Sequence, residues 1–354
     1  MGQGYFVLGN GGAAIQALKA IRVAGYTGEL HQISDDSGRA FNPMVAPYFL
    51  SKKTGWDTCF PFGENFIEEH QINAHYGDKV VALDADSSTI TTAGGKVFNY
   101  DKCLIATGAR PVIPPIPGLP ESHCALPLRE PQTAQNMLKS LSSASHALIL
   151  GASFVGVKLA EVFLEKGIRV VLVDIASQVM PQGAHKHAAQ HVEKYISSKG
   201  IDIRLGSSLS RVDDVPEGAI CHFPDGTMEK VDFIAVSAGI RPNLDFIDTE
   251  QVNIARAVCT NQFMQTNKPN LYAAGDVCES FDRLSLSQQW MGTWGNACYQ
   301  GRVAGMNMAG SATRYAGSIP QHVSPIFSWT YMQIGDALRE GAAVKYEESG
   351  DPFS

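Results

Sequence analysis

The feature that most constrains the fold is a strand, a glycine-rich turn and a helix that follow one another twice along the chain. In the first copy, the apolar run Tyr5–Leu8 leads into Gly9-x-Gly11-x-x-Ala14, and a helical pattern continues to about Gly25. A second strand, predicted over 29–33, closes at Ser34 and Asp35. This order is the βαβ unit, in which a helix connects two parallel strands.

The second copy repeats every part of this unit. A strand predicted over 146–150 leads into Gly151-x-Ser153-x-x-Gly156 and a further helical pattern. The strand that follows, predicted over 170–173, ends at Asp174. Strands that alternate with helices predict parallel sheets. We therefore predict an α/β fold with two doubly wound, Rossmann-like domains.

The first turn has the residue types that bind a dinucleotide pyrophosphate. Gly9 permits the tight turn, Gly11 lets the backbone approach the phosphates, and Ala14 allows helix and strand to pack closely. The phosphates then lie at the positive end of the helix. Asp35 follows Ala14 at about the spacing of the acid that binds the ribose hydroxyls. The alternative is an ordinary glycine turn of an α/β protein.

The second turn carries serine where the first has its middle glycine. Ser153 is compatible with a bound pyrophosphate if its small side chain points aside. Asp174 lies 18 residues after Gly156, where a carboxylate accepts from ribose hydroxyls and repels a 2′-phosphate, which favours NAD(H) over NADP(H). The stretch is also similar to the G-x-S-x-G nucleophile elbow, but its spacing is one residue too long, so we do not expect Ser153 to be a nucleophile.

Another internal similarity indicates how the two domains share the chain. Residues 100–111 and 231–242 each combine a buried strand, a small-residue turn and Arg-Pro. Four prolines between Arg110 and Gly118 predict an extended crossing between domains. We therefore predict that the second domain is inserted into the first. The expected boundaries are 1–118 and 244–320 for the first domain, 119–243 for the second, and 321–354 for the start of a truncated C-terminal α/β piece.

A later strand delivers Gly275 and Asp276 at its carboxyl end, where ligands lie in open α/β sheets. The Asp276 carboxylate then binds a ligand hydroxyl, or it caps the N-terminus of a following helix. The residues alone leave both alternatives open.

Composition narrows the classes of function. The net charge of −7 is too mild to indicate a nucleic-acid or membrane-surface partner, and no apolar run reaches the length of a membrane span. Seven cysteines without a C-x-x-C pair are typical of a reducing cytoplasm, not of a disulfide framework or a zinc module. His185, His187 and His191 have metal-like spacing, but their charged neighbours indicate a solvated helix, so we expect no metal.

The order of these motifs resembles that of the FAD-dependent pyridine nucleotide-disulfide oxidoreductase superfamily. Trp294-x-Asn296-Ala297-x-x-Gln300-Gly301-Arg302 further resembles a helix of the branch that contains NADH-dependent ferredoxin and rubredoxin reductases, nitrite reductases and NADH oxidases. The resemblance implies FAD in the first domain and NAD(H) in the inserted domain. Implied FAD-binding residues are Gly9, Gly11, Gly12, Ala13, Ala14, Ser34, Asp35, Pro47, Val81, Ala106, Thr107, Gly108, Gly275, Asp276 and Trp294. Implied NAD-binding residues are Gly151, Ser153, Phe154, Val155, Gly156, Asp174 and Gly239.

Met44 and Lys158 depart from the pattern of the superfamily, and Lys158 and Lys52 are the candidate catalytic residues. Met44 stands where the disulfide- and peroxide-reducing members carry a redox-active cysteine, so we expect neither activity, because a thioether forms no thiolate. Many relatives carry Glu where Lys158 stands. Lys158 could pair with Glu161, bond the nicotinamide carboxamide, stabilise reduced flavin, or be an ordinary solvated lysine. Lys52 lies where some relatives place a lysine near flavin N5.

The resemblance implies a cytoplasmic FAD-dependent NADH:acceptor oxidoreductase. The acceptor is then a ferredoxin- or rubredoxin-type carrier, or the iron–sulfur subunits of a larger complex such as a 2-oxoacid dehydrogenase. The alternatives are an NADH oxidase that forms H2O2 and, from another class, a non-catalytic nucleotide-binding module. Relatives continue with a longer C-terminal domain, so we expect an oligomer or complex subunit in which another chain completes the flavin site.

Overall fold

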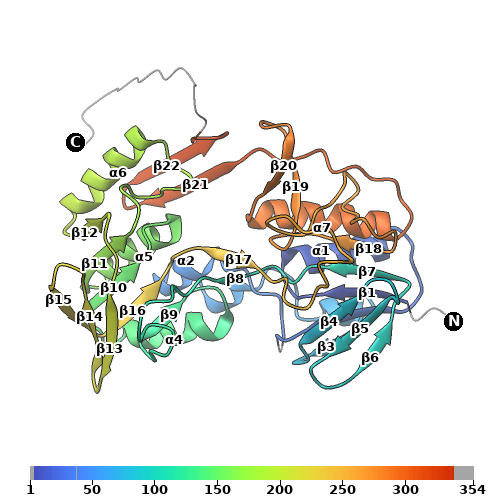
Figure 1. Cartoon of the computed structure of the whole chain (residues 1–354), viewed down its shortest axis with the longest axis horizontal. Helices are drawn as coiled ribbons and strands as arrows, with labels where there is room; N and C mark the ends of the chain where they lie inside the picture. Colours follow the sequence, from blue (N-terminus) through green and yellow to red (C-terminus); the bar gives the residue numbers. More distant parts are fainter. Residues whose placement is uncertain (1–3, 37, 339–354) are drawn as a thin grey trace. The chain divides into compact units, whose positions relative to one another are not determined.

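The computed structural model describes residues 4–36 and 38–338. The chain forms two compact units and passes between them several times (Figure 1). Unit 1 consists of Met1–Val45, Thr54–Arg110 and Ile240–Ile319, and unit 2 consists of Ala46–Lys53, Pro111–Gly239 and Pro320–Ser354. Each unit has its own parallel sheet and its own hydrophobic core.

Unit 1 is built on a five-stranded parallel sheet in the order β18-β7-β1-β2-β3. These strands are β1 (Tyr5–Leu8), β2 (Leu30–Ser34), β3 (Asn73–Tyr76), β7 (Lys102–Ile105) and β18 (Leu271–Ala273). The central strand β1 buries its last three residues completely, as expected of a parallel strand covered on both faces.

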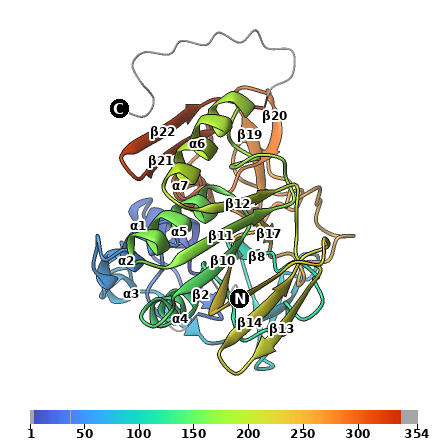
Figure 2. The same cartoon turned by 90° about the vertical axis from the view of Figure 1, so that its left-hand side faces the viewer.

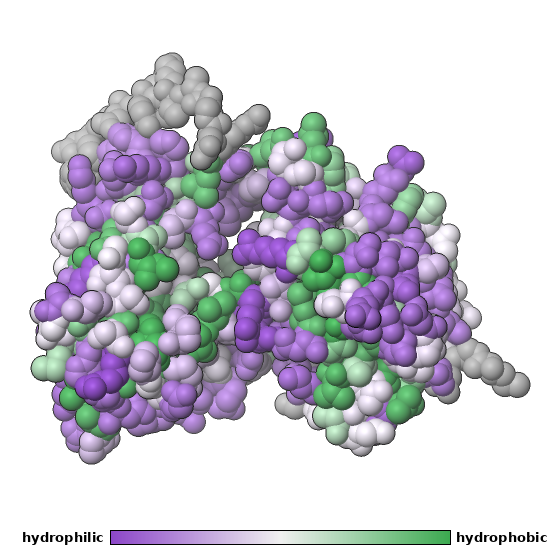
Figure 3. Space-filling model, in the orientation of Figure 1, coloured by the Kyte–Doolittle hydropathy of each residue, from purple (hydrophilic) through white to green (hydrophobic). Residues whose placement is uncertain are grey.

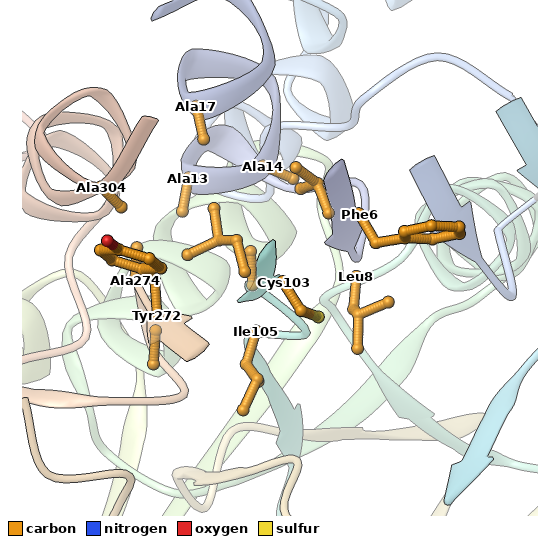
Figure 4. Close-up of a cluster of buried hydrophobic side chains, with 14 of the residues drawn as sticks. Phe6, Leu8, Ala13, Ala14, Ala17, Cys103, Ile105, Tyr272, Ala274 and Ala304 are labelled. Atoms are coloured by element: carbon orange, nitrogen blue, oxygen red, sulfur yellow. The ribbon is translucent and has the colours of Figure 1, made fainter. Parts of the chain in front are cut away.

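Two helices of unit 1, α1 (Gly12–Val23) and α7 (Trp294–Met308), lie side by side (Figure 1). They approach closely because α7 carries glycine at the contact. A Cβ on Gly301 would lie 2.0 Å from the carbonyl oxygen of Ala13, and one on Gly305 would lie 2.4 Å from that of Ala17. Figure 4 shows small side chains of both helices, such as Ala13 and Ala304, among the buried side chains of the sheet.

Unit 2 repeats this architecture. Its parallel sheet has the order β12-β11-β10-β16-β9, with the second glycine turn again following the central strand. Helix α5 (Phe154–Glu165) packs on β10 and β11, helix α6 (Lys186–Ser198) on β12, and α4 (Pro131–Leu141) on β9 (Figure 2). The strands are β9 (Ala125–Pro127), β10 (His146–Leu150), β11 (Arg169–Asp174), β12 (Asp202–Leu205) and β16 (Phe233–Val236).

Each unit also carries an antiparallel meander of three strands. In unit 1 these are β4 (Val80–Asp84), β5 (Thr89–Thr92) and β6 (Val97–Asn99), and in unit 2 β13 (Arg211–Val215), β14 (Gly218–His222) and β15 (Met228–Val231). The remaining elements are α2 (Ala46–Leu50), the 3₁₀ turn η1 (Trp56–Cys59), α3 (Phe66–Glu69), β8 (Ala109–Pro111), β17 (Ile240–Pro242), β19 (Glu279–Asp282), β20 (Ser287–Trp290), β21 (Gln321–Ile326) and β22 (Trp329–Ile334).

The hairpin formed by β21 and β22 packs one face on unit 2. Trp329 stacks on Tyr195 of α6, with ring centroids 3.9 Å apart and planes 3° from parallel. His322 stacks on Phe154 at the start of α5, with centroids 4.6 Å apart. The Tyr331 hydroxyl donates to the carbonyl oxygen of Gly183. The hairpin therefore belongs to the surroundings of the second glycine turn.

The surface mixes polar and apolar residues (Figure 3). Hydrophobic surface is visible at the tip of the hairpin of β19 and β20, where Leu286 is 73% exposed (Figure 3). Among the described residues, no helix is both long and apolar enough to cross a membrane.

The predicted α/β fold with two doubly wound, parallel sheets is confirmed. The units meet along the chain at 110/111 and 239/240, where we predicted 118/119 and 243/244. The segment Ala46–Lys53 is grouped with unit 2, and so is the chain from Pro320 onward, which we expected to begin a separate piece. The assignment of FAD to one unit and NAD(H) to the other stays a prediction.

Candidate functional site

The first glycine turn lies at the carboxyl end of β1, at the middle of the unit 1 sheet. Gly9 has a φ of 115°, and a Cβ there would lie 2.2 Å from the carbonyl oxygen of Ala106. The Gly9 amide donates to Ile33 on β2, and the Ala106 amide donates to Leu8. Only glycine fits at position 9, because the backbone there is left-handed and lies against Ala106, the residue that follows β7.

Helix α1 begins without a side-chain cap. Gly11 is the N-cap residue, and the position of a Cβ on Gly11 has no protein atom within 4 Å. The amides of Gly12 and Ala13 therefore begin a helix whose positive end faces open space. An uncapped helix N-terminus beside an open glycine is a cradle for a phosphate group. The residues of this turn fit a dinucleotide.

Helix α7 supports the turn from the other side. A Cβ on Gly12 would lie 2.7 Å from Sγ of Cys298 and 3.1 Å from the ring of Trp294. Burial raises the pKa of Cys298 to about 11, so this thiol is protonated at neutral pH. Trp294 and Cys298 therefore act as packing surfaces of the turn. Ala14 is fully buried behind them.

Two side chains hold the Gly275-Asp276 turn, and the sequence did not predict this role for either of them. The buried Gln300 accepts from the Gly275 amide at 2.7 Å and donates to the Ser280 hydroxyl at 2.7 Å. Trp290 donates from its indole nitrogen to the carbonyl oxygen of Asp276 at 2.8 Å. The Asp276 side chain stays partly exposed. Because β19 and not a helix follows it, Asp276 is not the N-cap of a helix.

A buried polar network, also missed from the sequence, fixes the first turn. Gln32, fully buried on β2, donates to the Gly9 carbonyl and to the Asn10 side chain, both at 3.0 Å. Asn10 donates in turn to the Gly38 carbonyl. The buried Nε of Arg39 has no hydrogen-bond partner among the described residues. The same guanidinium is already paired through Nη1 with the carboxylates of Asp57 and Glu64, so Nε is the nitrogen left for a further acceptor.

The other predicted FAD-binding residues are spread over both units. Thr107 and Gly108 follow β7, and Asn243 bonds to both through its side chain and its amide. The Ser34 hydroxyl accepts from the amide of Asp36, and Asp35 beside it is exposed. Val81, on β4, is 46% exposed. Pro47 is buried in α2 of unit 2, and Lys52 after it is exposed.

The second glycine turn repeats the first at the carboxyl end of β10. Gly151 has a φ of 111°, and a Cβ there would lie 2.4 Å from the carbonyl oxygen of Ser237. A Cβ on Gly156 would lie 1.9 Å from the carbonyl oxygen of Gly151. Both glycines are therefore required by close packing. Ser153 is the N-cap residue of α5, and Phe154 and Val155 begin its first turn.

Asp174 ends β11 beside this turn. Its carboxylate accepts from the amide of Ala152 at 2.6 Å and from that of Ala176 at 2.8 Å. The two amides fix the carboxylate at the edge of the glycine turn, where it is partly exposed. Gly239, with a φ of 105°, ends the segment after β16 and accepts from Val112.

Lys158 on α5 is 5% exposed, so it is not an ordinary solvated lysine. Its ammonium donates to both carboxylate oxygens of Glu161, as one of our alternatives predicted, and to the carbonyl oxygen of Pro325. Lys53 also reaches Glu161, at 3.4 Å. Burial works to lower the pKa of Lys53, but Glu161 and Glu165 outweigh it and raise that pKa.

Two further predictions concern sulfur and histidine. Met44 is 57% exposed, and Cys59 is fully buried, which raises the pKa of its thiol. His187 and His191 face each other on α6, with their Nε2 atoms 3.2 Å apart. The absence of a bound metal stays a prediction.

The chain matches the pyridine nucleotide-disulphide oxidoreductase family over residues 4–301, and it therefore belongs to that family. It is 29% identical over 343 residues to the NADH-dependent phenylglyoxylate dehydrogenase subunit epsilon of Aromatoleum evansii, covering 96% of this chain and 81% of that protein. It is 28% identical over 340 residues to an NADH oxidase of Methanocaldococcus jannaschii, covering 93% and 73%.

Solved structures share the fold at lower identity. The covalent putidaredoxin reductase–putidaredoxin complex has a TM-score of 0.87 at 19% identity, covering 94% of this chain and 81% of the matched chain. A NAD-dependent persulfide reductase from A. fulgidus has a TM-score of 0.88 at 23% identity, covering 95% and 64%.

Membership of this family defines the cofactors and the class of enzyme. Its members use FAD and NAD(H), as the resemblance implied. The protein is an FAD-dependent NAD(P)H oxidoreductase of the branch that contains the ferredoxin reductases and the NADH oxidases. This confirms the predicted class of enzyme.

Proposed function

We propose that unit 1 binds FAD, that unit 2 binds NAD(H), and that the protein passes electrons from NADH to a one-electron carrier protein or to iron–sulfur subunits of a larger complex. Bound FAD supplies the chemistry that accepts a hydride and gives up its two electrons one at a time. The chain binds the two nucleotides, orients them and excludes water.

In unit 1, the uncapped amides of Gly12 and Ala13 bind the FAD pyrophosphate across the open position of Gly11. Asp35 accepts from the adenosine ribose, and Asp276, held by Trp290 and the Gln300 bond to Gly275, accepts from the ribityl chain. Ser34, Val81, Ala106, Thr107, Gly108 and Pro47 stay proposed flavin contacts.

In unit 2, the start of α5 binds the NAD(H) pyrophosphate, and Asp174 accepts from the adenosine ribose hydroxyls. A 2′-phosphate would meet the negative charge of Asp174, so NADH is the preferred donor. Comparing kcat/KM for NADH and NADPH in wild type and Asp174→Ala checks this, because the variant should lose most of the preference. Lys158 beside the nicotinamide and Lys52 beside the flavin stay predictions as catalytic residues.

The observation that carries the choice of electron acceptor is the presence of Met44, and not a cysteine, at the position of the redox-active thiol. Relatives that reduce disulfides or peroxides hold a reactive thiol where this chain has an exposed thioether. Cys59, the next cysteine, is buried, and its raised pKa disfavours the thiolate. Electrons that leave the flavin therefore go to an external acceptor. The relative named as a subunit of an NADH-dependent phenylglyoxylate dehydrogenase, an enzyme named for a 2-oxoacid, supports a partner that is another subunit of a dehydrogenase complex. The iron–sulfur nature of that partner and a cytoplasmic location stay predictions.

The second candidate is an NADH oxidase that forms H2O2. The relative from Methanocaldococcus jannaschii that is named NADH oxidase supports the oxidase activity. In this function the acceptor is O2, and no carrier protein is needed.

One experiment on the FAD-loaded protein separates the candidates. NADH added without oxygen should bleach the yellow flavin absorption. A ferredoxin or rubredoxin should then restore the colour, with two carrier molecules reduced and one proton released for each NADH oxidised to NAD⁺. Fast recolouring by air alone, with one H2O2 formed per NADH, identifies the oxidase. A protein that cannot be loaded with FAD contradicts both functions.

A further inference from the structure

The two nucleotide turns follow a similar backbone course at their first glycine and at the N-cap residue, and at the N-cap the second turn carries Ser153 where the first has Gly11. The first glycines, Gly9 and Gly151, have φ of 115° and 111°. The N-cap residues are equally alike: Gly11 has φ −91° and ψ −175°, and Ser153 has φ −65° and ψ 174°. Each turn leads from the central strand of a parallel sheet into a 12-residue helix. Other positions of the two turns also differ, such as Gly12 and Phe154, but the exchange at the N-cap is the one that adds a polar side chain to the second turn.

The Ser153 hydroxyl has two partners within unit 2. It accepts from the amide of Gly156 at 3.3 Å, which makes it a side-chain cap of α5. It also bonds to the Ser237 hydroxyl at 2.6 Å. Ser237 follows β16, so the pair joins the start of the helix to the neighbouring strand end. At Gly11 no such group exists, and the space is open.

A cap changes what a helix N-terminus offers to an anion. The attraction comes from amides without an acceptor and from the positive end of the helix dipole. A serine cap satisfies one of these amides and places oxygen lone pairs beside the others. A pyrophosphate at the second turn therefore meets a helix end that is already partly satisfied, whereas the first turn has no competitor.

We propose that Ser153 is an affinity-determining residue that weakens NAD(H) binding and makes it readily reversible, while the uncapped turn at Gly11 retains FAD. The inference rests on the proposed assignment of NAD(H) to unit 2. The proposal also explains why the two turns should bind their nucleotides with different affinity, because NAD⁺ must leave after every turnover and FAD must stay bound. The backbone of both turns binds a pyrophosphate, and the Ser153 hydroxyl lowers the affinity of the second turn.

The test measures binding, not activity. Titration calorimetry on the FAD-loaded protein gives Kd for NAD⁺ and for ADP-ribose, which keeps the pyrophosphate and lacks the nicotinamide. Ser153→Gly should lower both Kd values about three- to ten-fold, the effect of one helix-capping hydrogen bond. Ser153→Ala keeps Cβ and removes the hydroxyl, and it should also bind more tightly than wild type. Kd values that are unchanged or higher in both variants overturn the proposal.

The reverse exchange tests the same idea in unit 1. Gly11→Ser should speed the loss of FAD on dialysis, and Gly11→Ala, which adds Cβ without a hydroxyl, should lose FAD more slowly than Gly11→Ser. Equal rates in the two variants contradict a role for the cap. Thermal unfolding checks that every variant is folded. Exchanges between serine and glycine at an N-cap change stability only slightly, and alanine at an N-cap costs more.

The outcomes keep this inference separate from the proposed function. If wild type binds neither NAD⁺ nor ADP-ribose, the assignment of unit 2 is wrong. If wild type binds both and the Ser153 variants bind no more tightly, the assignment stands and the role of the cap is wrong.

Discussion

The ammonium of Lys158 donates to both carboxylate oxygens of Glu161 at 2.8 Å, although the two side chains are 6% and 1% exposed. The same pair joins the β21–β22 hairpin to α5. Lys158 donates to the carbonyl oxygen of Pro325, and Glu161 accepts from the amide of Phe327. The hairpin is thus attached to the helix that begins at the second nucleotide turn by a buried ion pair as well as by stacked rings.

Lys158→Met should be strongly destabilising, because among the described residues it leaves the buried Glu161 carboxylate with the half-exposed Lys53 as its remaining ion-pair partner. Breaking a buried pair from one side costs about 3 kcal/mol or more. Chemical denaturation of the FAD-loaded protein measures the change. Lys158→Met combined with Glu161→Leu is the matched control, and it should recover most of the loss. A single variant as stable as wild type would show that the pair contributes nothing.

Gly301→Ala should destabilise unit 1 and release FAD. The added methyl would lie 2.0 Å from the carbonyl oxygen of Ala13, so α7 must move away from α1. Overpacking of this kind costs about 1–3 kcal/mol. Gly295→Ala on the same helix is the control, because a Cβ there meets no atom within 4 Å. The control should be neutral or slightly stabilising, since alanine is the better helix former. Thermal unfolding and retained flavin absorption report both variants.

The local units could be predicted from the sequence because their signals are local. A short apolar run that ends in glycines predicted β10 at its observed bounds, and the helices of both turns followed from their spacing. The repeat in turn predicted that each unit is built on a parallel sheet, which the structure confirms. A turn that needs glycine for its φ leaves a mark in the sequence that tertiary packing does not obscure.

The groups that position the site could not be predicted, because their roles depend on contacts between distant segments. Gln300 and Trp290 act on the Gly275-Asp276 turn only once α7 and β20 are packed beside it. A lysine on a helix is normally solvated, and burial of Lys158 depends on Pro325, far along the chain. The short antiparallel meanders could not be predicted either, because strands of three to five residues show little alternation of apolar and polar residues.

Gln300→Leu should weaken FAD binding, although leucine and glutamine side chains have similar volumes. The change leaves the buried Gly275 amide without its acceptor, at about 1–3 kcal/mol for an unsatisfied group, and leaves the Ser280 hydroxyl with its longer bond to Tyr315. Of the two side chains that hold the turn carrying Asp276, Trp290 then remains. Equilibrium dialysis should show weaker FAD binding, while Kd for NAD⁺ in unit 2 stays unchanged. Gln288→Leu is the control, because that glutamine is exposed on β20. FAD affinity equal to wild type in Gln300→Leu would exclude this role.

His322 should make unit 2 sensitive to mild acid. Burial against Phe154 and Gly183 lowers its pKa from the ordinary 6.5, and no charged group adds to the shift. Below pH 6.5 the unfolded chain therefore binds more protons than the folded one, so the free energy of unfolding falls as pH falls through this window. Burial also lowers the pKa of His75 in unit 1, so some acid sensitivity remains without His322.

His322→Phe keeps a ring on Phe154 and should reduce the drop in Tm between about pH 7.5 and about pH 5.5. Tyr331→Phe is the matched control in the same ring cluster, because the raised pKa of Tyr331 keeps it from titrating there, and it should retain the full drop. An identical drop in wild type and His322→Phe would show that this histidine is not the sensitive group.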